Sequence, residues 1–348
     1  MRAVRFPGSL RLVAMTLAVF THFLAAGAAY CQLNPSANAQ PTAELKSWKD
    51  CATKRALMAY LQRVTQPGGQ DFIPPSERIA VFDNDGTLWP ENPFPFQLAY
   101  AFDMVSKRAA ADPEFAKKEI VQAVLKKDVA TLLAGERHEG LLQVVAMTHA
   151  GMTVEEFNAS VAAWISQAVH PKFGKRYDAL TYLPMQEVLA VLRANGFKTY
   201  IVSGGGADFM RVWSERVYGI PPEQVIGSTA RTRFELREEK PVLVKTLDHF
   251  FIDDKEGKPV GIQQGIGRRP VVCFGNSDGD LAMLQYTTIG NPRLSFGAIV
   301  HHTDEVREYA YDAKPAGTGK LIDALNQASA QGWQVIDMKT DWSQVFAE

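Results

Sequence analysis

The stretch RIAVFDNDGT, residues 78–87, decides the fold of this chain of 348 residues. Its first half is an apolar run without alternation, which is typical of a strand buried on both faces of a parallel sheet. Its second half is rich in turn-forming residues, but the next segment, LWPENP at 88–93, contains two prolines and cannot supply a hairpin partner. We therefore predict that the strand ends at the ligand-binding edge of an open α/β sheet.

Asp83 and Asp85 follow the apolar run directly and give this stretch its chemical capacity. Carboxylates at positions i and i+2 of an extended segment point to the same side. One of them can act as a nucleophile while the other handles protons or a metal ion.

The rest of the chain predicts an α/β core that is interrupted by helices. Residues 96–170 carry almost no strand signal, and strands and helices alternate from about residue 182. Such alternation implies right-handed crossovers and a parallel sheet. We predict a Rossmann-like core formed by residues 40–94 and 176–348, with an inserted all-helical cap at 95–175.

The individual elements follow from periodicity and capping signals. Expected strands span residues 78–82, 198–202, 271–274 and 298–301. Expected helices span residues 42–65, 96–110, 113–125, 129–133, 138–148, 154–169, 183–194, 208–218, 260–267 and 281–285. Thr153 and Glu156 predict a capping box at the start of the helix at 154–169.

The N-terminal segment reads as an export signal. Three arginines precede an apolar run at residues 12–29, and the small-x-small segment 37–39 resembles a secretory cleavage site. We expect cleavage after Ala39 and a secreted or periplasmic protein that is not inserted in a membrane. A retained membrane anchor is the alternative, because the apolar run is nearly long enough to span a bilayer.

Charge and cysteine content exclude two classes of protein. The chain has 37 basic and 38 acidic residues, a formal net charge of −1, so it has no bulk attraction for nucleic acid. Removal of residues 1–39 would leave 34 basic and 38 acidic residues, a net charge of −4. Three cysteines cannot form a disulfide scaffold, and Cys273, in an apolar strand, is expected to be a buried thiol.

Three further polar motifs follow the first one along the chain. Ser203 ends the strand at 198–202 and precedes three glycines. Lys258 stands between Gly257 and Pro259 at an expected helix start, with Lys255 as a nearby competitor. The segment GNSDGD, residues 275–280, follows the apolar strand at 271–274.

In this order, the four motifs resemble those of the haloacid dehalogenase superfamily of phosphohydrolases, across about residues 78–302. The layout is similar to that of phosphoserine phosphatases, with a helical cap between the first two motifs. The resemblance implies an exported, Mg²⁺-dependent phosphomonoesterase that acts on a small phosphorylated metabolite through an aspartyl-phosphate intermediate. A non-catalytic protein that binds phosphorylated ligands and a phosphomutase are the alternatives.

The resemblance also implies residue roles. Asp83 would be the nucleophile and Asp85 the general acid and base, while Ser203 would bind phosphoryl oxygens and Lys258 would neutralise charge. The expected ligands of Mg²⁺ are Asp83, Asp85, Asn276 and Asp280. The expected substrate contacts are Gly204, Gly205, Thr87, Trp89 and Glu91.

Asn276 departs from the pattern, because many relatives carry aspartate at this position. An amide still offers a carbonyl oxygen, so we expect weaker metal affinity rather than its loss. Asp280 would then orient metal-bound water or Lys258. Asp278 is expected to cap a helix.

Overall fold

The protein is built on one twisted sheet whose centre is the strand of the opening motif. The computed structural model describes residues 44–132, 139–246, 248–315 and 317–348, so the predicted signal peptide at 1–39 lies outside the described residues. Six parallel strands lie in the order β3-β2-β1-β6-β7-β9. They are β1 (Ile79–Phe82), β2 (Lys198–Gly206), β3 (Val225–Ser228), β6 (Val272–Gly275), β7 (Phe296–Thr303) and β9 (Gln334–Asp337). The short β8 (Ala310–Tyr311) pairs antiparallel with β7. The predicted α/β fold with a parallel sheet is confirmed.

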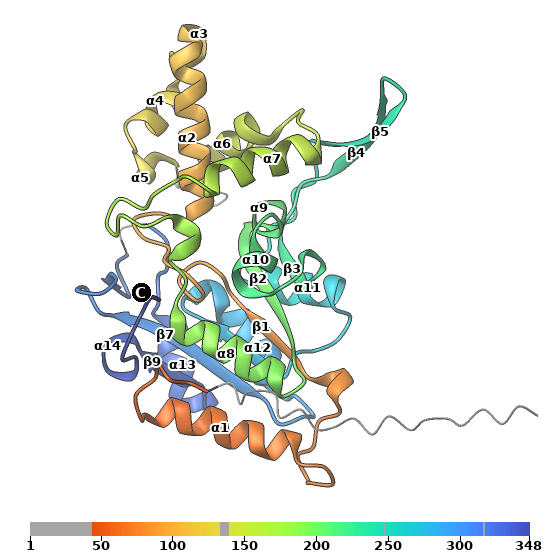
Figure 1. Cartoon of the computed structure of the whole chain (residues 1–348), viewed down its shortest axis with the longest axis vertical. Coiled ribbons are helices and arrows are strands. Elements are labelled where there is room, and N and C mark those ends of the chain that lie inside the picture. The colour runs from red at the N-terminus through yellow and green to blue at the C-terminus, as the bar shows by residue number, and fades with distance from the viewer. Residues whose placement is uncertain (1–43, 133–138, 247, 316) are drawn as a thin grey trace, which may run out of the picture. The chain divides into compact units, whose positions relative to one another are not determined.

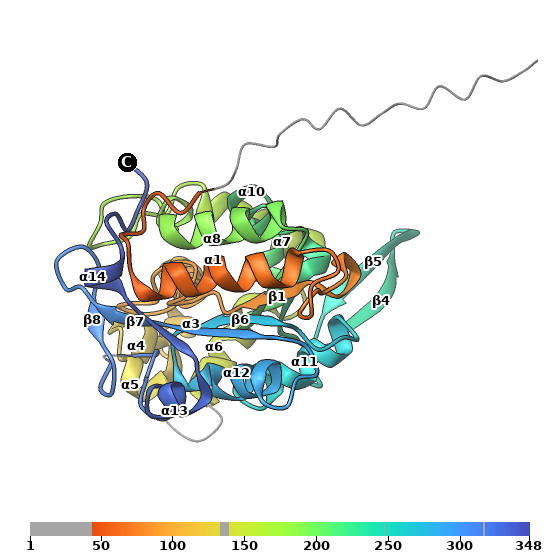
Figure 2. The same cartoon turned by 90° about the horizontal axis from the view of Figure 1, so that it is seen from below.

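Helices cover both faces of this sheet (Figure 2). One face carries α1 (Ala52–Thr65) and α8 (Leu183–Ala194), and the other carries α11 (Gly257–Gly265), α12 (Leu281–Thr288) and α13 (Asp323–Gln331). Along β1, Phe82 packs in the cluster with α1 and α8, whereas Val81 packs in the cluster with α11 and α12. Alternate residues of a strand point to opposite faces, so a strand covered on both sides must be apolar throughout. This explains the unalternated run in the sequence.

A helical insertion between β1 and β2 forms a separate layer above the sheet (Figure 1). It contains α2 (Phe96–Ala111), α3 (Pro113–Ala116), α4 (Glu119–Leu125), α5 (Val129–Leu132), α6 (Glu139–His149) and α7 (Val154–Ile165). It has an apolar cluster of its own, in which Phe102, Phe115 and Val121 are almost fully buried. The predicted helical insertion is therefore confirmed.

The capping box at α7 is present as predicted. The Glu156 backbone N–H donates to Thr153 Oγ1 at 3.1 Å, and the Thr153 N–H donates to Glu156 Oε2 at 2.7 Å. These bonds satisfy donors that have no partner inside the helix.

The predicted helix at 42–65 was wrong in its first half, because α1 begins at Ala52. Upstream of α1, Trp48 forms an isolated bridge with Trp342, and the Lys49 N–H donates to the Asp341 carbonyl at 2.8 Å. Backbone groups that pair with a distant segment cannot close helical bonds. The apolar spacing correctly indicated that Trp48 is buried, since it is 4% exposed. Its pairing with Trp342, however, prevents the helix that the spacing predicted.

Two predicted helices are each broken in two. The span 113–125 divides into α3 and α4 at Lys118, which is extended with ψ 134. The span 208–218 divides into α9 (Ala207–Arg211) and α10 (Ser214–Tyr218) at Trp213, whose ring stacks on Trp89 at 4.1 Å. The predicted helix at 154–169 ends earlier, at Ile165.

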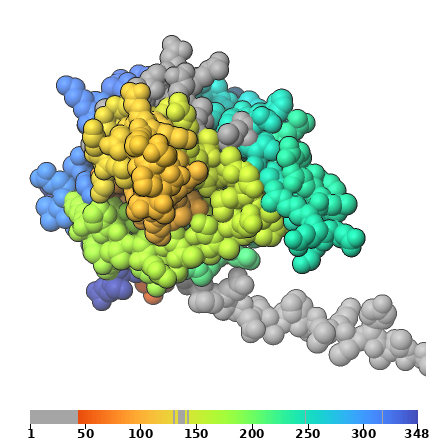
Figure 3. All heavy atoms as spheres, turned by 90° about the horizontal axis from the view of Figure 1, so that it is seen from above, coloured from red at the N-terminus to blue at the C-terminus, as the bar shows by residue number. Residues whose placement is uncertain are grey.

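Several short elements were not predicted. They are β3, β8, β9, α13, α14 (Met338–Asp341), the hairpin of β4 (Thr232–Arg237) and β5 (Lys240–Lys245), and the 3-10 turns Pro75–Glu77, Tyr177–Ala179, Pro222–Gln224 and Asp278–Asp280. The hairpin attaches to the chain just before α7 (Figure 3), where the Gly151 N–H donates to the Lys245 carbonyl and the Lys245 N–H to the Met152 carbonyl. Among the described residues, no helix is both long and apolar enough to span a bilayer.

The capping box gives a first test of the cap. We expect Thr153→Ala to lower the free energy of unfolding by about 1 kcal/mol, because it removes the hydroxyl that accepts the Glu156 N–H. Thr153→Ser keeps the hydroxyl and is the control. Urea unfolding of the three proteins measures the difference, and equal losses in both variants would contradict a capping role.

Candidate active site

The first and last motifs meet at the topological switch point of the sheet. From β1 the chain builds the sheet outward through β2 and β3, and then returns to the other side of β1 with β6. Asp83 follows β1, and its backbone N–H donates to the Phe274 carbonyl of β6 at 2.9 Å. Ligands of open α/β sheets bind at such a point.

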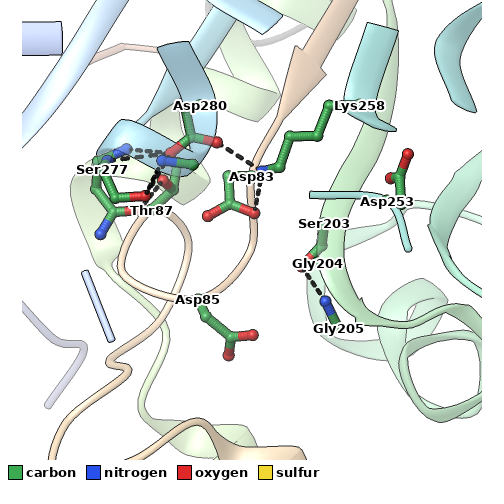
Figure 4. Close-up of polar contacts among 12 residues, drawn as sticks. Asp83, Asp85, Thr87, Ser203, Gly204, Gly205, Asp253, Lys258, Ser277 and Asp280 are labelled. Carbon is green, nitrogen blue, oxygen red and sulfur yellow. Dashed lines mark hydrogen bonds and ion pairs between the residues drawn. The ribbon is translucent and has the colours of Figure 1, made fainter. Parts of the chain in front are cut away.

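Lys258 joins two carboxylates at this point (Figure 4). Its Nζ lies 2.8 Å from Asp83 Oδ1 and 2.6 Å from Asp280 Oδ1, and the residue is 2% exposed. Burial alone would lower the pKa of Lys258, but the carboxylates of Asp280 and Asp83 raise it well above its usual value. The two carboxylates therefore favour the charged form of Lys258 beside Asp83. The competitor Lys255 is exposed.

Asp280 uses both of its oxygens within the protein. Oδ1 accepts from Lys258, and Oδ2 accepts the backbone N–H groups of Asn276 at 2.9 Å and Ser277 at 3.1 Å. These bonds hold the last motif and Lys258 in one arrangement. They assign Asp280 to the support of Lys258, while its contact with a metal ion stays a prediction.

Asp85 lies on the side of Asp83 opposite Asp280 (Figure 4). The indole of Trp89 holds its carboxylate. Trp89 Nε1–H donates to Asp85 Oδ1 at 2.6 Å. Burial raises the pKa of Asp85 to about 6. A carboxyl group with such a pKa exchanges protons readily near neutral pH, as a general acid and base requires.

The second motif brings Ser203 toward Asp85. Ser203 is 1% exposed, and its Oγ accepts the Gly205 N–H at 3.2 Å. A Cβ atom placed on Gly205 would lie 3.5 Å from Ser203 Oγ and 3.6 Å from Asp85 Oδ2. The two side chains thus face one small space beside Gly205.

Gln97 was missed by the sequence analysis. It belongs to the first turn of α2, and its Oε1 accepts the Gly206 N–H at 2.6 Å. The same oxygen lies 3.6 Å from the Cβ position of Gly205. The cap therefore reaches the second motif through this side chain. The available signal in the sequence was a polar residue directly after Phe96, at the start of the predicted helix at 96–110.

The amide of Asn276 has a fixed orientation. Its Oδ1 accepts from Thr87 Oγ1 at 3.1 Å, and its Nδ2 donates to Glu91 Oε1 at 2.6 Å. Gly86, with φ +77°, is required beside it, because a Cβ there would lie 2.1 Å from Nδ2. Glu91 also accepts from Tyr311 and Thr318, and burial raises its pKa to about 7.

Two of the expected substrate contacts are deeply buried. Trp89 is 1% exposed and Glu91 is 4% exposed. They bind Asp85 and Asn276, respectively, and their contact with substrate stays a prediction. Thr87 is fully buried and bonded to Asn276, whereas Gly204 is exposed and Gly205 is half-buried.

The oxygen donors at this point suit Mg²⁺. Of the four expected ligands, Asp280 has both oxygens engaged within the protein, which leaves the Asp83 carboxylate, the Asp85 backbone carbonyl and Asn276 Oδ1. Hard cations prefer such oxygens. Nδ2 donates to Glu91 and Oδ1 accepts from Thr87, so Oδ1, through its second lone pair, is the atom of the amide that could bind a cation. In the part of the chain that the structure describes, no three His, Cys, Asp or Glu side chains form a metal cluster. A cation here would therefore depend on neutral oxygens as well as Asp83.

Asp278 acts as a helix cap, as expected, but for a distant helix. Its Oδ1 accepts the backbone N–H groups of Ile322 and Ala324 at 3.0 Å each, at the start of α13. The carboxylate satisfies donors of the first turn and favours the helix dipole.

Asp253 is a second residue that the sequence analysis missed. It lies near Ser203 and Lys258 (Figure 4) and is 0% exposed. Neither of its carboxyl oxygens has a hydrogen-bond partner among the described residues. Burial raises its pKa to about 7. A buried acid without partners is stable chiefly in its neutral form.

The burial of Asp253 predicts that the difference in stability between wild type and Asp253→Asn depends on pH. Well below pH 3.8, the ordinary pKa of aspartate, the residue is protonated in folded and unfolded chains, so wild type and Asp253→Asn should be nearly equal. As pH rises from about 4 to about 7, the unfolded wild type loses a proton that the folded form retains, which lowers its stability. Above pH 7, we expect Asp253→Asn to be more stable by at most about 4 kcal/mol.

Urea unfolding between pH 4 and pH 8 measures this difference. Asp248→Asn changes an exposed aspartate and should show no such trend. A constant difference between wild type and Asp253→Asn at all pH values would contradict the prediction.

Lys258 gives a second stability test. Lys258→Met leaves Asp83 and Asp280 buried without their counter-ion, so we expect the free energy of unfolding at pH 8 to fall by about 3–5 kcal/mol. Lys255→Met, at an exposed site three residues away, should change it by less than about 0.5 kcal/mol. Chemical denaturation compares the two, and similar losses would contradict the role of Lys258.

Comparisons with known proteins agree with this arrangement at the level of family. Residues 80–285, more than half of the chain, match the family of haloacid dehalogenase-like hydrolases. No curated protein matches the sequence. A conserved functionally unknown protein from Anaerococcus prevotii DSM 20548 is 18% identical, with 85% of this chain and 94% of that chain covered and a TM-score of 0.49. A protein with unknown function from Bordetella pertussis Tohama I is 18% identical, with 75% and 99% covered and a TM-score of 0.47.

Phosphoserine phosphatase from T. onnurineus is 18% identical, with 69% of this chain and 90% of that chain covered and a TM-score of 0.33. At such identities and TM-scores, none of these structures indicates a substrate. The family match spans the strand before Asp83, the serine motif, Lys258 and the segment 275–280. The chain therefore belongs to the haloacid dehalogenase-like hydrolase family.

Proposed function

We propose that this hydrolase is a Mg²⁺-dependent phosphomonoesterase that cleaves small phosphate esters. The observation that carries the proposal is the placement of Asp83 between the buried cation of Lys258 and the space that Asp85 and Ser203 share. A nucleophile, a proton donor and a positive charge are the groups that phosphoryl transfer needs.

Asp83 would attack phosphorus and form an aspartyl-phosphate. Its Oδ1 is bonded to Lys258 in a buried setting, and the raised pKa of that lysine keeps the positive charge in place. A fixed charge beside the nucleophile stabilises the negative charge that develops on the phosphoryl group. Asp280 holds the lysine in this position through its 2.6 Å bond.

Asp85 would protonate the leaving oxygen and later remove a proton from the attacking water. Its pKa of about 6 supports both directions of proton transfer near neutral pH. Ser203 Oγ and the backbone amides of Gly204 and Gly205 would donate to the phosphoryl oxygens.

Mg²⁺ would be held by the Asp83 carboxylate, the Asp85 carbonyl and Asn276 Oδ1, and when bound it would neutralise phosphoryl charge. Glu91 and Thr87 fix the Asn276 amide, and its oxygen would be the atom that holds the cation. Because an amide brings no charge, we infer weaker metal affinity than an aspartate at this position would give.

The cap supports a small substrate. Gln97 extends from α2 and accepts the Gly206 N–H, so a cap residue lies against the second motif. A substrate must fit below this layer, and exclusion of water during phosphoryl transfer protects the intermediate. The proposed location outside the cytoplasm rests on the sequence pattern of residues 1–39 alone.

Removal of the nucleophile tests the reaction. We expect Asp83→Asn to lower kcat/KM for p-nitrophenyl phosphate by about 10³-fold or more, because the amide cannot form the covalent intermediate. Asp248→Asn, at an exposed site, should retain activity. Phosphate release is the measurement, with circular dichroism to check folding. Activity in Asp83→Asn equal to that of the wild type would refute the mechanism.

Metal dependence is tested in the same assay. We expect a chelator to abolish activity and added Mg²⁺ to restore it. Binding of phosphate esters without turnover would instead favour a non-catalytic binding protein. Formation of an isomeric ester rather than free phosphate would favour a phosphomutase.

A further inference from the structure

We propose that Trp89 is a positioning residue that assigns the proton of Asp85 to a single oxygen, Oδ2. The proposal rests on the proposed function, in which Asp85 is the general acid. It gives Trp89 a part in the reaction that does not require contact with the substrate.

The hydrogen bond from Trp89 to Asp85 is short and locally enforced. Nε1 lies 2.6 Å from Oδ1. The backbone of the same turn closes on itself, because the Gly86 N–H donates to the Trp89 carbonyl at 2.8 Å. The two residues are therefore held together by the turn as well as by their side chains.

The indole ring is fixed by its neighbours. It is 1% exposed and lies 4.1 Å from the ring of Trp213 and 4.3 Å from the ring of Phe96, measured between centroids. Trp213 marks the break between α9 and α10, and Phe96 begins α2. Contacts from core and cap thus set the direction of the N–H group.

The chemistry of the indole determines where the proton of Asp85 is placed. An indole N–H is a donor only and cannot accept a hydrogen bond. A proton on Asp85 Oδ1 would turn that oxygen into a hydroxyl, which is a weaker acceptor for the buried Nε1–H than a carbonyl oxygen. Protonated Asp85 therefore carries its hydrogen on Oδ2.

Oδ2 is the oxygen that faces the second motif. It lies 3.6 Å from the Cβ position of Gly205, and Ser203 Oγ lies 3.5 Å from the same position. The proton is thus held on the side where the phosphate ester would bind. In the ionised state, the N–H bond to Oδ1 also stabilises the carboxylate.

The proton of Asp85 then passes to the leaving group. The Asp83 carboxylate forms a bond to phosphorus while the bond from phosphorus to the ester oxygen breaks, and its electron pair stays on that oxygen. The ester oxygen takes the proton from Asp85 Oδ2 and leaves as an alcohol. Asp85 becomes a carboxylate whose Oδ1 still accepts from Trp89.

The chain offers a matched control. Trp89→Phe keeps an aromatic ring in the stack and removes the N–H donor. Trp213→Phe makes the same change in the adjacent ring, whose Nε1 is buried and has no hydrogen-bond partner among the described residues. A purely structural effect of losing an indole should be similar in the two variants.

Leaving-group dependence is the kinetic readout. General acid catalysis contributes about 10²–10⁴-fold, and an alkoxide needs this help far more than p-nitrophenolate does. We expect Trp89→Phe to lower kcat/KM about 10- to 100-fold for a small alkyl phosphate, and much less for p-nitrophenyl phosphate. Trp213→Phe should affect both substrates equally. Because kcat/KM reports only steps up to phosphoryl transfer, later hydrolysis of the intermediate does not enter.

An NMR measurement tests the bond without activity. In protein labelled with ¹⁵N-tryptophan, we expect the indole N–H resonance that disappears in Trp89→Phe to lie downfield. Asp85→Ala should move it upfield, whereas Trp213→Phe should leave it downfield.

The outcomes separate this proposal from the proposed function. An active wild type with equal leaving-group dependence in both tryptophan variants, or a Trp89 resonance insensitive to Asp85→Ala, overturns the role of Trp89 alone. A wild type that hydrolyses no phosphate ester overturns both.

Discussion

The buried contact of Lys258 with Asp83 and Asp280 is the interaction on which the site depends. A lysine that is 2% exposed costs free energy unless its charge is paired, and two carboxylates at 2.8 and 2.6 Å supply the pairing. The same contact joins three segments that are far apart in the sequence: the end of β1, the start of α11 and the turn after β6. Any displacement of one segment would leave a buried charge without a partner. The arrangement is therefore both a structural constraint and a source of positive charge beside Asp83, the proposed nucleophile.

A second constraint joins the first motif to the last. Gly86 permits the close approach of Asn276, and the amide is then fixed between Thr87 and Glu91. On the other side of Asp83, Trp89 holds Asp85 through a single N–H group. The short loop after β1 thus supplies the two carboxylates that we propose to react, and it also supplies residues that orient Asp85 and Asn276. Asn276 places an uncharged amide oxygen directly after β6. The neighbouring carboxyl group of Glu91 orients this amide by accepting its N–H.

Much of the fold could be predicted because it leaves patterns in short stretches of the sequence. The unalternated run 79–82 reflects burial on both faces, and the capping box at Thr153 reflects the unpaired N–H groups of a helix start. The predictions failed where distant pairing competes with periodicity. Trp48 pairs with Trp342 in place of a helical turn, and Trp213 interrupts a helix to stack on Trp89. The hairpin β4–β5 was missed because its charged residues mask strand alternation.

The sequence by itself determined the family pattern, the order of the four motifs and the residue types that can perform the chemistry. These follow from short apolar strands and the polar residues at their ends, which are local properties of the chain. Only the tertiary structure decided which lysine is buried, that both oxygens of Asp280 are engaged, that Gln97 reaches the second motif, and that Trp89 binds Asp85. The physical reason is that burial and hydrogen-bond partners depend on segments brought together from distant parts of the sequence. The type of a residue determines which hydrogen bonds and charges its side chain can offer, and the packing around it determines which of these it uses.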